Sequence, residues 1–251
     1  MCICRLPDFV PCLTHLSDEV LLHIHSYLPL TSLIVARGVC KLWRSLIPGS
    51  HIPDYRRRLL ELYLRAINSS AFRETRKQVR ARLRPFNRDH YIARLPKSLP
   101  DDFRCWVLEW PEHAVIGTLW PGLRHGRSPH EDANELADRG TVLLSAHIIN
   151  RLLLHPPDTV EVAAPWQPAK KEVAQALILD SVFVEGSPSG KFLILHGTLD
   201  GADLSGKVYQ LDGTKGKLAN PVAQNWTEYL AQELEREEEW LRERESESLF
   251  G

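Results

Sequence analysis

Hydrophobic residues are densest near the start of the chain, where they recur with the spacing of a helix. Eighteen of the 32 residues from 16 to 47 are apolar or aromatic, against 43% of the whole chain. One face of a helix is indicated by residues spaced four apart: Leu16, Val20, Ile24 and Leu28. Pro29 should end this helix. We expect a short second helix at residues 33–36, ended by Gly38, and a third helix from Val39 to Ile47.

This segment carries more apolar surface than three short helices can bury among themselves. Units below about 40 residues rarely build a sufficient core alone. The surplus must therefore pack against the rest of the chain or against another protein. The hydrophobic pattern by itself leaves both possibilities open.

The order of residues in this segment resembles the F-box motif. Residues 16–28 read Leu-Ser-Asp-Glu-Val-Leu-Leu-His-Ile-His-Ser-Tyr-Leu, and residues 39–46 read Val-Cys-Lys-Leu-Trp-Arg-Ser-Leu. The F-box family begins Leu-Pro-x-Glu-hydrophobic-Leu, continues to Ser-Tyr-Leu, and ends Val-Cys-Lys/Arg-x-Trp-x-x-Leu. Ser17 replaces the usual proline, a change that the first turn of a helix tolerates.

The resemblance implies that residues 16–50 dock onto a Skp-family adaptor of a cullin ubiquitin ligase. The side chains expected to contact the adaptor are Leu16, Val20, Leu21, Ile24, Leu28, Leu33, Val39 and Trp43. Some of them must form the core of the segment instead, and the pattern does not separate the two groups. The resemblance further implies a non-catalytic protein of the cytoplasm or nucleus that selects targets for ubiquitination.

Residues 51–98 are expected to form a helical region between the F-box segment and a larger domain. Apolar residues at every fourth position from Tyr55 to Ile67 predict an amphipathic helix. Further helices are expected near residues 72–83 and 89–95.

Charge is distributed unevenly, although the net charge of the chain is only −1. Residues 56–88 hold ten arginines and one lysine against two glutamates, whereas residues 233–247 hold eight glutamates and three arginines. The basic stretch could contact nucleic acid, but no recognition motif accompanies it, and solvated helix faces are the simpler interpretation. The acidic stretch is expected to project as a helix or to form a charged tail at residues 236–251, and it could fold back on the arginines.

The region from residue 99 to residue 235 combines strand-like runs with helices, which predicts an α+β fold. Strands are expected at residues 114–120, 160–164, 176–184, 191–196 and 207–211. Glycine, proline and aspartate in the intervening turns suit hairpins. Asn225 and Glu228 have the spacing of a capping box that opens a long final helix. The expected architecture is a three-helix F-box, an antiparallel or mixed sheet flanked by helices, and a long C-terminal helix.

Three segments of this region resemble the SUKH superfamily, which includes fungal cell-wall-assembly regulators and bacterial toxin-immunity proteins. They are Leu99–Leu108, Gly206–Leu211 and Val222–Leu230, although Gln224 and Asn225 depart from the Asp-Ser of the family. The resemblance implies a protein-binding α+β domain at residues 99–235, here combined with an F-box as in a family of fungal proteins. The rival interpretations are a binding or immunity-type module whose F-box-like start is only a helical cap, and a nucleic-acid binder.

Candidate target-binding residues are Trp120 and Trp166, because both lie beside prolines in loop-like settings. Burial of both tryptophans in the core is the competing interpretation. No phosphate-binding loop, metal-ligand spacing or nucleophile motif occurs, so no catalysis, cofactor or metal is predicted. Residues 1–15 are expected to be a disordered tail, and no membrane span is predicted.

Overall fold

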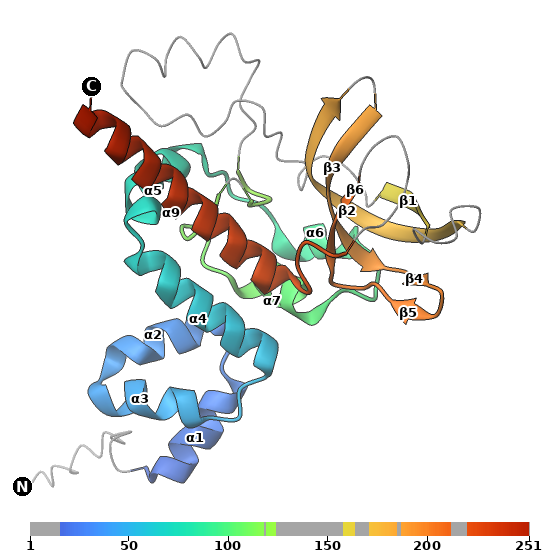
Figure 1. Ribbon diagram of the computed structural model, residues 1–251. Coiled ribbons are helices and arrows are strands. Elements are labelled where there is room, and N and C mark those ends of the chain that lie inside the picture. Colours follow the sequence, from blue (N-terminus) through green and yellow to red (C-terminus); the bar gives the residue numbers. More distant parts are fainter. Residues whose placement is uncertain are drawn as a thin grey trace, which may run out of the picture. The chain divides into compact units, whose positions relative to one another are not determined.

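The computed structural model describes residues 16–117, 119–123, 158–163, 171–184, 187–211 and 220–250. The chain divides into two compact units, Met1–Pro53 and Asp54–Gly251 (Figure 1). The helices at residues 54–98, expected to form a separate connecting region, therefore belong to the second unit. No helix in the described part of the chain has the length and apolar character needed to cross a membrane.

Three helices and a short 3-10 turn form the first unit, as the periodicity predicts. They are α1 (Asp18–Tyr27), α2 (Leu30–Val39), α3 (Lys41–Leu46) and η2 (Ile47–Gly49). The second helix is longer than expected, because it begins directly after Pro29 and continues through Gly38. Gly38 lies one residue from the helix end, where its cost of about 1 kcal/mol does not break the helix. Cys40 then opens α3, and its Sγ accepts the N–H of Trp43 at 3.5 Å.

The second unit contains five helices within its described residues. They are α4 (Asp54–Asn68), α5 (Ser70–Arg82), α6 (Arg88–Ala93), α7 (Asp101–Glu109) and α9 (Trp226–Phe250). Helix α9 packs on α4, α5 and α7. It begins as expected, since Asn225 Oδ1 accepts the N–H of Glu228, although Glu228 reaches back to the N–H of Gln224 instead of Asn225. The helix is continuous to Phe250 and buries Leu241, so the residues expected to form a charged tail from position 236 onward continue helix α9.

Aromatic side chains form the centre of the helical part of this unit. The ring of Trp106 meets those of Trp120 and Trp226 edge to face, with centroids 5.1 and 4.9 Å apart. Phe103 adds a third edge contact to Trp226 at 5.3 Å. Such contacts add about 0.5–1.5 kcal/mol per pair beyond the burial of area. Helices α7 and α9 are therefore joined by a shared aromatic core.

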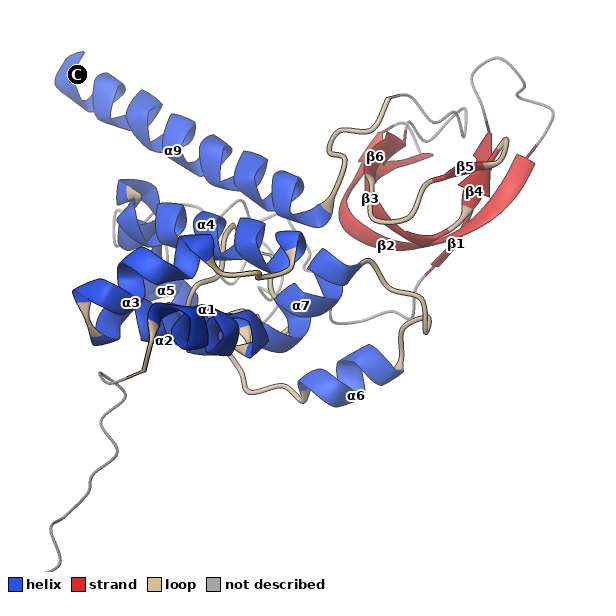
Figure 2. Ribbon diagram, turned by 90° about the horizontal axis from the view of Figure 1, so that it is seen from below, coloured by secondary structure: helices blue, strands red, loops and turns tan. Residues whose placement is uncertain are grey.

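A four-stranded antiparallel sheet completes the second unit, as Figure 2 shows. Its strands, in spatial order, are β1 (Asp158–Ala163), β2 (Lys171–Val184), β3 (Ser187–His196) and β6 (Val208–Leu211). A small hairpin joins β4 (Thr198–Leu199) to β5 (Ala202–Asp203) through Asp200 and Gly201, whose φ values are 50° and 79°. Positive φ at both central positions is what a two-residue hairpin turn requires.

The strand predicted at residues 114–120 is wrong. The described part of this run is a buried loop, in which Ala114 N–H bonds to the carbonyl of Pro111 and Leu119 N–H to that of Ile116. Gly117 has a φ of 60°, a left-handed conformation that interrupts an extended backbone. The apolar residues are explained by burial in the core and not by sheet pairing.

Candidate functional site

Helix α1 exposes a line of large apolar side chains. Leu16 just precedes the helix, and Val20, Ile24 and Tyr27 follow at steps of four, four and three residues, so they share one face. Tyr27 is the most exposed of them, at 74%. The face that the periodicity predicted is therefore present, and the described residues leave it partly uncovered.

The other two helices of the first unit add to this exposed apolar surface. Val35 and Val39 lie one turn apart on α2, at 68% and 58% exposure, and Leu42 is exposed on α3. Seven of the eight large apolar side chains that are exposed in the described part of the chain belong to this unit. Such a concentration is typical of an interaction surface and not of a monomeric protein's exterior. We call these seven residues the apolar docking set: Leu16, Val20, Ile24, Tyr27, Val35, Val39 and Leu42.

The structure sorts the side chains that the F-box resemblance suggested as adaptor contacts. Four of the eight are exposed members of the apolar docking set: Leu16, Val20, Ile24 and Val39. Leu28 and Trp43 are half-buried. Leu21 and Leu33 are at most 1% exposed, so these two are corrected to core residues of the segment.

Three exposed residues escaped the sequence interpretation: Tyr27, Val35 and Leu42. A signal for two of them existed. Tyr27 lies three residues after Ile24 on the same helical face, and Val35 lies four residues before Val39. Leu42 gave no such signal, because its helix spans only six residues.

His25 is an unusual member of the core of this unit. Its side chain is fully buried, its ring meets that of Trp43 edge to face at 5.4 Å, and neither ring nitrogen has a hydrogen-bond partner among the residues that the structure describes. Burial lowers the pKa of His25, because a charged imidazole would lose its hydration. His25 therefore packs as a neutral ring, and its protonation at low pH would destabilise this unit.

In the second unit, the segments Leu99–Leu108, Gly206–Leu211 and Val222–Leu230 meet in space. Strand β6 contacts the approach to α9, where the N–H of Val208 bonds to the carbonyl of Ala223 at 2.9 Å. Gly206 has a φ of 82°, and a Cβ there would lie 3.3 Å from the Cβ of Pro100. Asp102 joins the first segment to the third, since its Oδ2 accepts the N–H of Thr227 at 3.1 Å.

Asp102 is a buried carboxyl group that holds helix α9 at its amino end. Its Oδ1 accepts the N–H of Phe103 at 2.9 Å, so both oxygens bind backbone donors. Burial raises the pKa of Asp102, and the N–H groups of Thr227, Phe103 and Trp226 limit that rise. A negative group at a helix N-terminus is stabilising, and a capping role accounts for this residue without catalysis.

One of the two tryptophans suggested as target-binding anchors, Trp120, is not available in that role. Trp120 is fully buried, packed edge-on against Trp106 and Phe86 with the guanidinium of Arg88 5.2 Å from its ring centroid. The expectation of an exposed anchor at Trp120 is therefore corrected, because the loop that carries it folds back on the core: Arg84 N–H bonds to the carbonyl of Gly122 at 2.8 Å. Trp166 lies outside the described residues.

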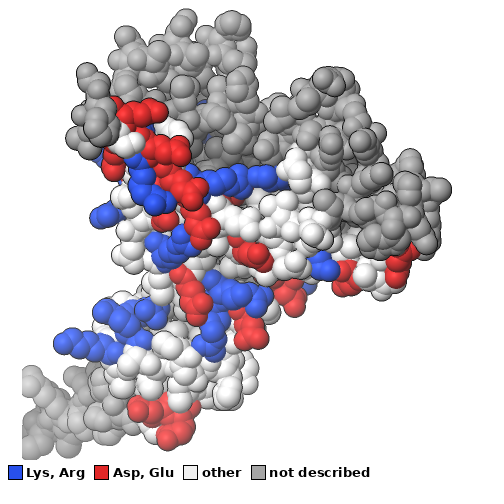
Figure 3. Space-filling model, viewed as in Figure 1, with Lys and Arg blue, Asp and Glu red and all other residues white. Residues whose placement is uncertain are grey.

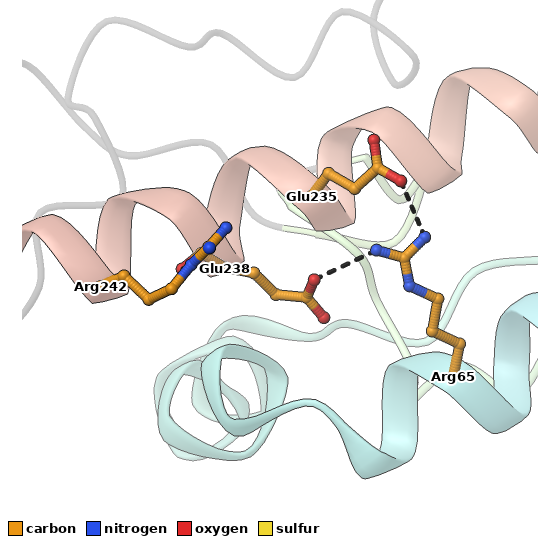
Figure 4. A network of polar contacts seen from close by, with 4 residues as sticks. All are labelled: Arg65, Glu235, Glu238 and Arg242. Atoms are coloured by element: carbon orange, nitrogen blue, oxygen red, sulfur yellow. Dashed lines mark hydrogen bonds and ion pairs between the residues drawn. The ribbon is translucent and has the colours of Figure 1, made fainter.

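The acidic stretch of α9 does fold back on the arginine-rich helices. Arg65 of α4 donates to Glu235 at 2.9 Å and to Glu238 at 3.1 Å (Figure 4). The hydrogen bond to Glu235 is the main reason that the pKa of Arg65 is raised. Arg244 lies 3.6 Å from Glu74 of α5. Figure 3 accordingly shows acidic and basic side chains side by side over α9 and α4.

An open groove of ≈ 450 Å³ lies between α4 and the first turns of α9. Arg58 and Arg65 line it together with Glu61 and Glu228, so its charges cancel. Leu62 and Ala231 supply apolar lining. The groove favours no charge of ligand, and we assign it no occupant.

Comparison with known families matches one part of this chain: residues 13–53 fit the F-box domain. This range contains α1, α2, α3 and η2 and the whole apolar docking set. F-box domains generally bind Skp-family adaptors, which link them to a cullin, and proteins that carry them are typically non-catalytic adaptors. The SUKH-like and fungal resemblances of the remaining chain are not supported. No curated protein and no solved structure matches the chain.

Proposed function

We propose that this protein is the substrate-recognition subunit of a Skp–cullin–F-box ubiquitin ligase. The observation that carries the proposal is the apolar docking set, which lies entirely inside the matched F-box domain. The side chains of the set are between 36% and 74% exposed, whereas Leu21, Leu30 and Leu33 are at most 1% exposed. A partner that covers the set would bury apolar area that the chain alone leaves exposed, and this burial would stabilise the complex.

The magnitudes are sufficient for a stable complex. Full burial of one large apolar side chain is worth about 1.5–3 kcal/mol. The members of the set are already partly covered, so each would contribute less. Association costs about 4–15 kcal/mol, and seven side chains together can exceed the lower part of that range.

The second unit would then hold the protein to be ubiquitinated. The convergence of the three SUKH-like segments supports this assignment. Their resembling residues pack against one another in three pairs: Pro100 with Gly206, Val208 with Ala223, and Asp102 with Thr227. A SUKH-like protein-binding role for residues 99–235 remains part of the proposal. The rival function is a binding or immunity-type module whose first helices are only a cap, and such a module would ignore the adaptor.

Adaptor binding by the full chain tests the proposal. The double variant Val20→Asp, Ile24→Asp places two charges on the exposed face of α1 without touching the core. We expect it to weaken binding to a recombinant Skp-family adaptor about 100-fold or more, because buried unpaired carboxylates are costly. Trp240→Asp is the control, since Trp240 is an exposed apolar residue in the described part of the second unit, and it should leave affinity unchanged.

Circular dichroism should show both variants folded, because exposed substitutions usually change stability by less than about 0.5 kcal/mol. A folded double variant that binds the adaptor as well as the unmodified chain would refute the proposed docking surface. A folded unmodified chain that does not bind the adaptor would favour the rival module.

A further inference from the structure

Helix α5 carries three exposed cations in one line. Arg73, Lys77 and Arg80 follow each other at steps of four and three residues, and all three are exposed. This spacing places them on one face of the helix, over a length of about 10 Å. The opposite face is apolar and buried through Ala71, Phe72 and Val79. We call the three cations the α5 basic face.

The α5 basic face has no carboxylate partner in the described part of the chain. Arg73 Nε donates instead to the backbone carbonyl of Ser69, four residues earlier in the chain, at 3.4 Å. Glu74, the acidic residue of α5, pairs instead with Arg244 of α9. Like charges three and four residues apart repel each other on a helix. The three cations are therefore open to a negatively charged partner.

Other arginines of the basic stretch differ clearly from these three. Arg56 makes a bidentate pair with Glu109, and Arg65 pairs with two glutamates of α9. Arg88 donates to the carbonyls of Val107 and Leu108. These arginines hold the unit together. The cations of the α5 basic face, in contrast, make no such contacts with other elements of the described chain and stay exposed.

Two arginines of α5, Arg76 and Arg80, act on a nearby histidine. His113 lies near the helix, and its pKa is lowered by burial first and then by Arg76 and Arg80. Arg76 is itself half-buried, with its guanidinium 5.9 Å from the ring centroid of Phe72. A negatively charged group approaching this face would relieve the repulsion among the cations and would be attracted to them.

A short acidic peptide fits this face better than a nucleic acid. Helix α9 packs on α5 and carries eight glutamates against three arginines at residues 233–247. A polyanion longer than the face would meet these carboxylates, whereas a short peptide segment can avoid them. The carboxylates of α9 that pair with Arg65 show that acidic side chains on a protein segment already dock on these helices.

We propose that the α5 basic face, Arg73, Lys77 and Arg80, docks a short acidic segment of the target protein. This inference rests on the proposed function, in which the second unit holds the target. It specifies the chemistry that the target must present, namely several carboxylates within about 10 Å along one segment.

The test uses the full chain and an oligo-glutamate peptide with a fluorescent label. We expect saturable binding at low salt that weakens severalfold at about 0.15 M salt, because exposed charges are screened. The variant Arg73→Glu, Lys77→Glu should weaken binding about tenfold or more. Arg104→Glu, Lys97→Glu is the matched control: both residues are exposed in the same unit and change the net charge equally, and this variant should bind as the unmodified chain does.

A single-stranded RNA of the same length and adaptor binding are measured on the same samples. The inference is overturned if the peptide does not bind, if both double variants weaken it equally, or if the RNA binds as tightly as the peptide. Loss of peptide binding in Arg73→Glu, Lys77→Glu with intact adaptor binding supports it. Failure of the unmodified chain to bind the adaptor would instead defeat the proposed function, so the two failures are distinguishable.

Discussion

The first unit, Met1–Pro53, exposes seven large apolar side chains, whereas the much longer second unit exposes Trp240 among its described residues. The second unit buries its aromatic residues against one another: Trp106, Trp110, Trp120 and Trp226 are all at most 1% exposed. This difference indicates which contacts stabilise each unit. The second unit completes its own core, whereas the first leaves apolar area for a partner to cover.

The two units also differ in their charges. The second unit pairs many of its charged groups, such as Arg56 with Glu109 and Lys191 with Glu233. The first unit shows no such ion pair in its described residues, and its helix α1 opens with Asp18 and Glu19, which favour the helix N-terminus. Apolar contact would therefore dominate binding by the first unit, and electrostatic contact would contribute more to binding by the second.

The largest expected effect on stability comes from a core substitution, and it distinguishes the roles of the two units. Trp106→Ala should destabilise the second unit by about 3–5 kcal/mol, because it removes the ring that contacts Trp120 and Trp226. Chemical denaturation followed by tryptophan fluorescence measures this change. Adaptor binding should persist, whereas Leu33→Ala in the core of the first unit should abolish it. Equal loss of adaptor binding in both variants would contradict the assignment of docking to the first unit.

The next effect concerns a buried carboxyl group of α9. Burial raises the pKa of Glu237 to about 7 from its ordinary value of 4.5, and one of its oxygens has no hydrogen-bond partner within the described part of the chain. A raised folded pKa gives stability that is complete below 4.5 and is lost as the pH rises through about 7. The advantage of Glu237→Gln over the unmodified chain should therefore grow by about 2 kcal/mol between about pH 5 and pH 8. Denaturant titrations at both pH values measure it, and an advantage independent of pH would exclude the carboxyl group as its cause.

His25 gives the first unit the opposite pH dependence. Its folded pKa is lowered below 6.5 by burial, so its contribution to stability is present above pH 6.5 and is lost as the pH falls below it. His25→Phe should remove this loss, because phenylalanine packs as a ring without a titrating nitrogen. Hydrogen exchange of the α1–α3 amides at several pH values reports it. Equal acid sensitivity in both proteins would contradict the burial of a neutral His25.

The smallest expected effect lies in the surface network of Figure 4. Arg65→Met removes the pairs with Glu235 and Glu238 but keeps an unbranched side chain on α4. The pairs are largely exposed, so the loss should be below about 1 kcal/mol and should shrink further at high salt. Thermal unfolding at two salt concentrations measures it. A loss as large as that of Trp106→Ala would mean that charge, and not the aromatic core, holds α9 in place.

Local sequence signals predicted most of the fold. The four-residue spacing of α1, the Asn225 cap of α9 and the glycine-containing hairpin turn all act within a few residues, and the structure confirms them. The strand prediction at residues 114–120 failed because a buried loop can be as rich in apolar residues as a strand. Only the distant packing partners distinguish the two.

The candidate site was less predictable from sequence. Val20 and Leu21 are both apolar and adjacent, yet one is 45% exposed and the other 1%. Which of them is buried depends on how the three helices pack, and periodicity does not encode that packing. The contact of Asp102 with Thr227 likewise joins residues far apart in the chain. The prediction of an exposed Trp120 failed for the same reason, since its neighbouring proline indicated a loop without showing that the loop is buried.

Calorimetric titration of the full chain with a recombinant Skp-family adaptor, at several temperatures, tests the central claim most directly. We expect saturable binding with a dissociation constant below about 1 µM and a negative change in heat capacity, the sign of buried apolar surface. The Val20→Asp, Ile24→Asp variant should lose both. Absence of binding by a folded chain, or binding without a negative heat-capacity change, would contradict the conclusion that the adaptor completes the apolar surface of the first unit.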